Sequence, residues 1–574
     1  MTQFELPIAL LPSKTALEPE LVSDLELVAT TDEARCLYHH VFSDTQTIGA
    51  RTINRWAGHY TKDRGYIKDT QRLLRKTLPS ALSPELEEGI LAVWSAIERR
   101  KTAGDDVDGF HGQYQYIDWP SLKWLNKHAA FLTCLSAYNI GSPVLSLATP
   151  IFMLLIPFVA LKLTGRRISL HTYVEVLKVS MKSHALGKLF NLNQASKEEK
   201  VYIAVSVAFY LFQVYQNIRS CIQFCGNMKT VRNHLVSTRE FLQKWIEDAE
   251  KFQRQTGSFK SYKPFHQATS LHVARAREFL EDIPSVTHDD HWGQRALGIG
   301  ADMKSFYAVH QDEAFHETLG YALDWTAYLV NMRNVQALVK SGRLNRCTLS
   351  RRKTKFEDAY FPGSGEDPVR NTYSLDRHLL VTGPNAAGKT TILKATLFNI
   401  LLSQQLGVGF YKRARICPFD KIHCYINIPD TSGRDSLFQA EARRCKNILA
   451  AIERGGPSAR HFCVFDELYS GTNPYEAIGS AEAFLRYIGN NKRVSFVMTT
   501  HFLDLCARLD EHERVRNCHM DATASSRGME YTYKLRGGVS RVKGGVEVLK
   551  ALAYPSSVVE GAQDAVESMA SEVR

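Results

Sequence analysis

The sequence lacks several features that would place it in a simple class of protein. No repeat and no low-complexity tract runs through its 574 residues, so we do not expect a repeat array or a mainly disordered chain. The eleven cysteines are scattered without the paired spacing of a metal site, and we interpret them as reduced thiols of an intracellular protein. The first apolar run follows the acidic Glu5 rather than a basic stretch, which argues against a secretory signal.

Charged residues are absent from two long apolar stretches. Residues 129–161 and 201–218 contain no Asp, Glu, Lys or Arg, and each reaches the length of about 18 to 20 residues that a helix needs to cross a bilayer. The connection 162–200 carries eight Lys and Arg against three Glu, which is opposite to the positive-inside tendency if the hairpin spans. Two interpretations therefore stay open, a membrane hairpin and a pair of buried core helices.

The composition is otherwise that of a globular protein, with 44% hydrophobic and 23% charged residues. Its length is enough for about three or four domains. The net charge of +11 favours acidic partners such as nucleic acid or an anionic membrane surface. The stretch His288–His291 has side chains that can bind metal, but four adjacent residues rarely surround one ion, so we interpret it as a surface loop.

A bend of small residues lies between an apolar run that ends at Val381 and a helix-like run from Ile392 to Leu402. It has the spacing of a phosphate-binding loop, because backbone amides of small residues approach phosphate oxygens closely and a helix N-terminus points at the same place. The lysine after the loop would reach the β- and γ-phosphates, and the next hydroxyl would bind Mg²⁺. The candidate nucleotide-binding residues are Gly383, Pro384, Asn385, Ala386, Ala387, Gly388, Lys389, Thr390 and Thr391.

Two further apolar runs end in polar side chains that suit nucleotide hydrolysis. The run Phe462–Phe465 is followed by Asp466 and Glu467, which we assign as magnesium ligand and general base. Another run ends at His501, where a side chain at the carboxyl edge of a sheet can contact the γ-phosphate or the attacking water. The candidate catalytic residues are thus Glu467, His501 and Lys389, and the candidate metal ligands are Thr390 and Asp466.

The order and spacing of these segments resemble the ATPase domain of the MutS family of DNA mismatch-repair and recombination ATPases. The segments that carry the resemblance are TGPNAAGKTT, DSLFQAEARR, DELYSGTNPYEA and TTHF, and the resemblance covers about residues 345 to 565. It implies that Ser436 acts in trans on the nucleotide of a partner subunit. The chain departs from the family pattern at Ala387, where glycine is usual, and at Tyr469 and Ser470, which replace Gly-Arg.

We therefore predict an α/β P-loop NTPase domain of the MutS/ABC type at the C-terminus, residues 346–574, preceded by a mostly α-helical core or lever. Residues 1–128 are predicted as a mostly helical N-terminal region and 129–225 as two long apolar helices. Residues 226–345 are predicted as the helical lever, because Leu242, Trp245, Ala249 and Phe252 recur at helical spacing.

The resemblance implies an intracellular, nuclear or cytoplasmic, ATPase that uses ATP and Mg²⁺ and works as a homodimeric clamp. We expect duplex, mismatched or branched DNA as its partner, in mismatch repair or recombination. The alternative is a membrane-anchored MutS-like motor or scaffold without mismatch recognition. About 120 residues precede the first long apolar stretch, which leaves little space for the family's usual pair of N-terminal domains, and no Phe-x-Glu occurs in them.

Overall fold

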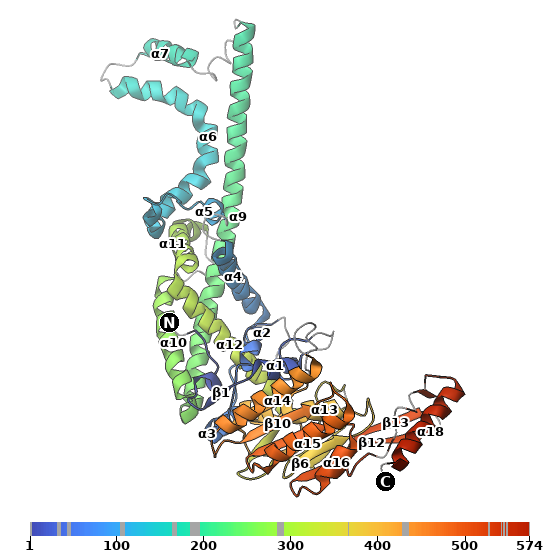
Figure 1. Cartoon of the computed structure of the whole chain (residues 1–574). Helices are drawn as coiled ribbons and strands as arrows, with labels where there is room; N and C mark the ends of the chain where they lie inside the picture. Colours follow the sequence, from blue (N-terminus) through green and yellow to red (C-terminus); the bar gives the residue numbers. More distant parts are fainter. Residues whose placement is uncertain are drawn as a thin grey trace. The chain divides into compact units, whose positions relative to one another are not determined.

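The computed structural model divides by its contacts into two compact units, which are described separately (Figure 1). Unit 1 contains residues 1–81, 248–271 and 323–574, and unit 2 contains residues 82–247 and 272–322. The segment boundaries predicted at 128, 225 and 345 stay predictions, and the stretch His288–His291 lies outside the described residues. The structure describes residues 3–30, 36–42, 47–103, 109–163, 169–183, 196–283, 292–365, 367–426, 436–525, 528–540, 542, 546, 549–550 and 552–572.

A six-stranded sheet forms the centre of unit 1, with the strand order β13-β12-β6-β11-β10-β9. Strand β6 pairs in parallel with β11 and β12, and β10 pairs in parallel with β9 and β11, whereas the edge pair β12 and β13 is antiparallel. Strands β6 and β10 are buried along almost their whole length and apolar in their middle residues, as expected for parallel strands covered on both faces. The bounds are β6 His378–Thr382, β9 Lys421–Tyr425, β10 His461–Asp466, β11 Val494–Thr499, β12 Val515–Ser525 and β13 Gly528–Gly537.

Helices follow the parallel strands and cover the sheet. The core against one face contains Phe465 and Phe496 from the strands and Ile448 and Leu485 from helices, all buried. Helix α13 follows β6, α15 follows β10 and α16 follows β11, so the predicted order of strand, loop and helix around residue 383 is confirmed. The helices are α13 Lys389–Gln405, α14 Leu437–Arg454, α15 Pro474–Asn490, α16 Leu503–Asp510 and α18 Ser556–Glu572.

A second, five-stranded sheet lies next to the first in unit 1, with the order β5-β4-β8-β3-β7. The prediction of an α/β domain in the C-terminal part of the chain is confirmed by these two sheets and their helices. The strands are β3 Asn345–Leu349, β4 Lys355–Ala359, β5 Asn371–Ser374, β7 Val408–Gly409 and β8 Arg413–Ile416.

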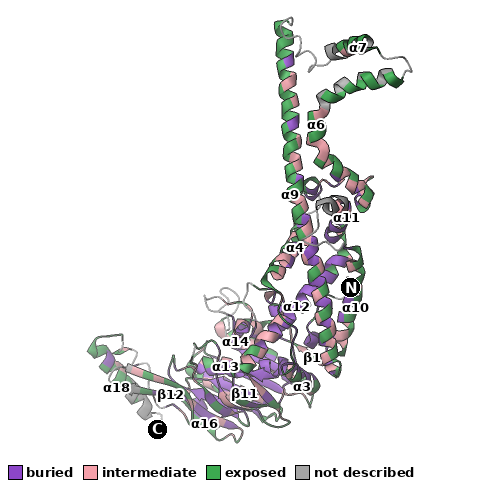
Figure 2. Cartoon of the chain, turned by 180° about the vertical axis from the view of Figure 1, so that it is seen from behind, coloured by how far each residue is buried: buried purple, intermediate pink, exposed green. Residues whose placement is uncertain are grey.

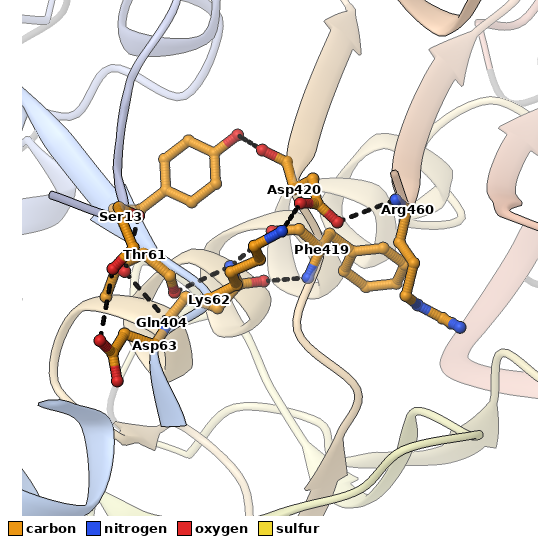
Figure 3. Close-up of polar contacts among 9 residues, drawn as sticks. Ser13, Thr61, Lys62, Asp63, Gln404, Phe419, Asp420 and Arg460 are labelled. Atoms are coloured by element: carbon orange, nitrogen blue, oxygen red, sulfur yellow. Dashed lines mark hydrogen bonds and ion pairs between the residues drawn. The ribbon is translucent and has the colours of Figure 1, made fainter. Parts of the chain in front are cut away.

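The N-terminal residues of the chain belong to the same unit as these sheets. The side-chain amide of Gln404, at the end of α13, donates to the carbonyls of Thr61 (3.1 Å) and Phe419 (2.9 Å). Lys62 forms an ion pair with Asp420 (Figure 3). The N-terminal elements are η1 Pro7–Leu10, β1 Lys14–Ala16, α1 Pro19–Asp24, η2 Leu37–His40, α2 Ala50–Trp56, β2 His59–Thr61 and α3 Arg64–Leu73.

Gln405 continues this attachment. Its side chain accepts a hydrogen bond from the Tyr38 hydroxyl (3.0 Å) and donates to the carbonyls of Trp56 (2.7 Å) and His59 (2.9 Å). Gln404 and Gln405 are both fully buried, so their hydrogen bonds lie away from water, where an unpaired polar group is costly.

Unit 2 is helical, as predicted for the region before the α/β domain. Its interior includes an aromatic cluster in which the Phe110 and Phe306 rings lie 5.8 Å apart. The long helices α9, α10 and α12 contribute residues to both units. The helices are α4 Pro84–Ala103, α5 Phe110–Tyr114, η3 Lys123–Lys127, α6 Ala129–Leu163, α7 Leu170–Ser183, α9 Lys197–Thr256, η5 Lys260–Tyr262, α10 Lys263–Asp282, α11 Trp292–Gln311 and α12 Glu313–Lys340.

Candidate nucleotide-binding site

The loop 383–388 joins β6 to α13 at the carboxyl edge of the parallel sheet. Gly383 and Gly388 have φ of +152° and +90°, and a Cβ on Gly388 would approach the Tyr533 ring at 3.2 Å. Ala386 has φ of +62°, a conformation that L-residues rarely adopt. Ala387, which stands where the family usually has glycine, is buried and is not among the described residues with positive φ. Its methyl group therefore fits without backbone strain.

Lys389 begins α13, and its side chain folds back over the loop. Its Nζ donates to the carbonyls of Gly383 (3.1 Å) and Pro384 (3.3 Å) and lies 3.1 Å from His501 Nε2. Glu467 Oε1 is 4.0 Å away. Burial lowers the pKa of Lys389, although Glu467 and Asp466 act in the opposite direction. The ammonium group thus lies against the loop, where a phosphate would lie.

The two predicted metal ligands are in direct contact. Thr390 Oγ1 donates to Asp466 Oδ2 at 2.7 Å, and Thr499 Oγ1 donates to the other carboxylate oxygen, Oδ1. A hydroxyl and a carboxylate at this position supply oxygen ligands, which Mg²⁺ prefers, and leave its other positions to water and phosphate. The residues present therefore fit a magnesium ion at the end of β10.

Glu467 and His501 are in hydrogen-bonding contact at the same edge. His501 Nε2 lies 2.9 Å from Glu467 Oε1, and this hydrogen bond is the largest cause of a lowered Glu467 pKa, with Lys389 adding to it and burial opposing it. The Glu467 backbone N–H donates to the carbonyl of Thr499 at 3.2 Å, and its φ is +52°. The structure therefore brings together the three predicted catalytic residues, Lys389, Glu467 and His501.

Glu441 of α14 fixes the turn that follows Glu467, and we did not assign it this role from the sequence. Its carboxylate is 2% exposed and accepts hydrogen bonds from Ser470 N, Ser470 Oγ and Gly471 N, each at 3.1 Å. A Cβ on Gly471 would lie 2.8 Å from the Phe438 nitrogen. Glu441 lies within the segment DSLFQAEARR, which resembles the family, but only the fold brings α14 against this turn.

Ser436 is the N-cap of α14. Its hydroxyl accepts from the Gln439 backbone N–H (3.3 Å), and its own N–H donates to the Gln439 side chain (3.0 Å), which is a capping box. Within one chain its role is therefore that of a helix cap, and its action on a partner's nucleotide stays a prediction. Asn385 in the loop and Thr391 in the first turn of α13 are exposed to solvent.

A cavity of about 360 Å³ adjoins the phosphate-binding loop. Three aromatic side chains from two segments form part of its wall, and the guanidinium of Arg370 lies 5.3 Å from the Tyr360 ring centre. Its size and mixed lining suit a nucleoside whose phosphates extend towards the loop. The sequence patterns do not predict this cavity. Its lining residues are Ala359, Tyr360, Phe361, Ser364, Asp367, Val369, Asn371, Gly388, Thr391, Ile392, Ala395, Met520 and Tyr533.

A parallel sheet with this loop, the Thr390–Asp466 contact and the adjoining cavity at one edge is typical of α/β phosphate-binding domains. Residues 379–570 match the family model of MutS domain V, the ATPase domain of that family. The resemblance to the MutS family is therefore confirmed for the C-terminal part of the chain.

Curated relatives agree with this assignment. The DNA mismatch repair protein MutS of Phocaeicola vulgatus is 29% identical over 217 residues, which is 37% of this chain and 24% of the relative. The proteins of the same name from Persephonella marina and Bacteroides fragilis are 27% and 29% identical, over 37% of this chain and 24% and 25% of the relatives. The matched region thus spans about a quarter of the length of these relatives.

Proposed function

We propose that this chain is a Mg²⁺-dependent ATPase of the P-loop class. The observation that carries the proposal is the contact between Thr390 and Asp466, a magnesium-type oxygen pair, directly beside Lys389 at the phosphate-binding loop. Bound Mg²⁺ would neutralise phosphate charge as the γ-phosphoryl group leaves. The match to MutS domain V supports the same function.

In the proposed mechanism, the amides of the loop 383–388 and the ammonium of Lys389 hold the phosphates, and the cavity holds the nucleoside. Glu467 accepts the proton of the attacking water, because its lowered pKa keeps it anionic. His501 contacts Glu467 and would offer its ring nitrogen to the γ-phosphate of a bound nucleotide at the same sheet edge. Ser436 of a second copy of the chain completes the site in a homodimer.

We further propose DNA as the macromolecular partner, with nucleotide binding closing a dimeric clamp in mismatch repair or recombination. Two observations support this proposal, the names of the relatives and the net charge of +11. The relatives are matched over about a quarter of their length, so the support concerns the ATPase part of the chain.

The second candidate function is a membrane-associated ATPase that does not recognise mismatches. The observation that favours it is the exposure of two long apolar helices of unit 2, α6 and α9.

ATP hydrolysis by the full-length protein tests these functions. We expect Lys389→Ala to lower hydrolysis about 100-fold or more, because the ammonium stabilises charge that develops in the transition state. Glu467→Gln should retain ATP binding and lose turnover. Unchanged hydrolysis by Lys389→Ala would contradict the assigned site.

Adding duplex, mismatched and four-way-junction DNA at two salt concentrations distinguishes DNA from a membrane as the partner of the ATPase. Stimulation that disappears at high salt is expected for a DNA-dependent ATPase, because phosphate contacts weaken as salt rises. A hydrolysis rate that is the same with and without each DNA would contradict DNA as the partner and favour the membrane-associated ATPase.

A further inference from the structure

Helices α6 and α9 of unit 2 expose an unusually large apolar surface. Both are long and apolar enough to cross a membrane, and the qualifying windows are only 11% buried. Figure 2 shows these helices mainly in the colour of exposed residues. Within this chain, the described residues of these helices are thus mostly not packed into a core. The exposed large aliphatic and phenylalanine side chains are Ile140, Val144, Leu145, Leu147, Ile151, Phe152, Leu155, Ile156, Phe158, Val159 and Leu163 on α6, and Val201, Val205, Phe209, Leu211, Phe212, Ile218 and Ile222 on α9.

Polar groups, by contrast, lie between the two helices. The Tyr210 hydroxyl donates to the Ser146 carbonyl at 3.0 Å, and the Asn217 amide donates to the Ser146 hydroxyl. The Cys221 thiol lies 3.7 Å from the carbonyl of Ile140. These contacts run antiparallel, so the two helices form a hairpin with a polar seam and an apolar outer surface. Ile203 and Val214, which are buried, lie on the same face of α9 as Tyr210 and Asn217, so the seam also contains apolar side chains. Hydrogen bonds between helices beneath an apolar outer surface are typical of helices packed in lipid.

The dimensions fit a bilayer as well. The uncharged part of α9 lies between Lys200 and Arg219, and its 18 residues span roughly 27 Å at 1.5 Å per residue, close to a hydrocarbon core of about 30 Å. Tyr202 and Tyr215, near the two ends of this part, are 58% and 59% exposed. Tyrosines in such positions are typical of the two membrane–water interfaces.

The width of the apolar surface indicates whether lipid or a second protein covers it. At 100° per residue, the exposed apolar side chains of α9 between Val201 and Ile222 cover an arc of roughly 200°. A helix that packs on protein through one stripe needs an arc of about 100°. A fluid solvent covers the wider arc, whereas a second copy of the hairpin would leave much of it in water.

We propose that the α6–α9 hairpin inserts into the hydrocarbon interior of a lipid bilayer, with its polar seam hidden between the two helices. Lys200 and Arg219 flank the inserted part of α9, where each can contact lipid phosphate, and Glu198 and Glu199 precede Lys200 outside the inserted part. The prolines of α6 and its bend in Figure 1 are compatible with insertion, because membrane helices tolerate proline.

Flotation of the full-length protein with vesicles of phosphatidylcholine and phosphatidylglycerol tests the proposal. The wild-type protein should float with the vesicles and stay bound in 1 M salt and in alkaline carbonate. Phe209→Lys combined with Phe212→Lys places two charges on the outer surface of α9 and should lower the bound fraction roughly tenfold or more, because lysine is strongly disfavoured at the bilayer centre. Leu271→Lys is the matched control, since Leu271 is 48% exposed on α10 outside the hairpin, and it should float like the wild type.

Two results would overturn the proposal. One is release of the wild-type protein by salt alone, which shows binding to headgroups without insertion. The other is a wild-type protein that stays in the aqueous fraction and is a single oligomer without detergent, which shows that a second copy covers the hairpin. ATP hydrolysis by the detergent-solubilised double variant should equal that of the wild type, which confirms that the variant is folded and that lost flotation reports on the hairpin.

Discussion

Glu441→Ala offers a quantitative test of the site geometry. The substitution removes the acceptor of three hydrogen bonds, from Ser470 N, Ser470 Oγ and Gly471 N, at a position that is 2% exposed. Ser470 and Gly471 are themselves exposed, so water can replace Glu441 as the acceptor for their N–H groups. The loss is then that of two backbone hydrogen bonds at a net of about 0.5 to 1.5 kcal/mol each, so we expect local destabilisation of roughly 1 to 3 kcal/mol.

Amide hydrogen exchange of the peptides that contain residues 466–475 measures this effect directly, because exchange reports local opening. The hydrogen-bonded amides of Ser470 and Gly471 should exchange roughly 30-fold faster in Glu441→Ala, which corresponds to about 2 kcal/mol. ATP turnover should fall with them, since the turn follows the proposed base Glu467 immediately. Peptides from β6 and α13 should keep wild-type exchange.

Ser470→Ala is the matched control for this experiment. It removes one of the three hydrogen bonds and leaves both backbone N–H groups paired with Glu441. We expect a cost of about 0.5 to 1.5 kcal/mol. The reasoning fails if Glu441→Ala and Ser470→Ala give the same exchange rates, because the buried carboxylate would then not hold the turn.

Three further outcomes follow from the structure. The contact with His501 lowers the pKa of Glu467, so the stability that it contributes is present above the ordinary pKa of 4.5. This stability is lost as the pH falls through the lower pKa of the folded state. The difference in unfolding midpoint between the wild type and His501→Ala should therefore shrink from pH 5 to pH 3. Ala386→Gly should raise stability by about 1 kcal/mol in thermal unfolding, because its φ is +62°, and Ala387→Gly should not; equal shifts would refute the assignment of strain to Ala386. Gln405→Leu should lower stability by about 2 to 4 kcal/mol and speed hydrogen exchange in residues 36–42 and 55–61, and wild-type exchange there would show that its buried hydrogen bonds do not hold this segment.

The phosphate-binding loop was predictable from sequence because its chemistry is local. Gly383, Gly388 and Lys389 stand within seven consecutive residues, and the apolar runs on either side indicate the strand and helix that position them. The meeting of Asp466 with Thr390 could also be expected, since the carboxyl ends of parallel strands lie at one edge of a sheet. The hydrogen bond between the two side chains agrees with that expectation.

Other parts of the site depend on contacts between distant residues, which periodicity and spacing do not contain. Tyr38 and Gln405 form a hydrogen bond across 367 positions of the chain, so the N-terminal residues could not be predicted to pack with the α/β sheets. The cavity beside the loop combines Tyr360 and Tyr533, which become neighbours only after both sheets have formed. The exposure of α6 was likewise undecided, because an uncharged sequence fits a buried helix and a membrane helix equally well.

Because the N-terminal segment packs on the end of α13, we expect that the nucleotide-binding domain cannot fold as an independent fragment. A fragment that starts near residue 346 would leave Gln404 and Gln405, now fully buried, without the backbone carbonyls of Trp56, His59 and Thr61 that satisfy them. Such a fragment should aggregate, whereas joining residues 1–81 to it should restore solubility. Exchange of this domain between related proteins would therefore have to transfer two separate stretches of the gene together.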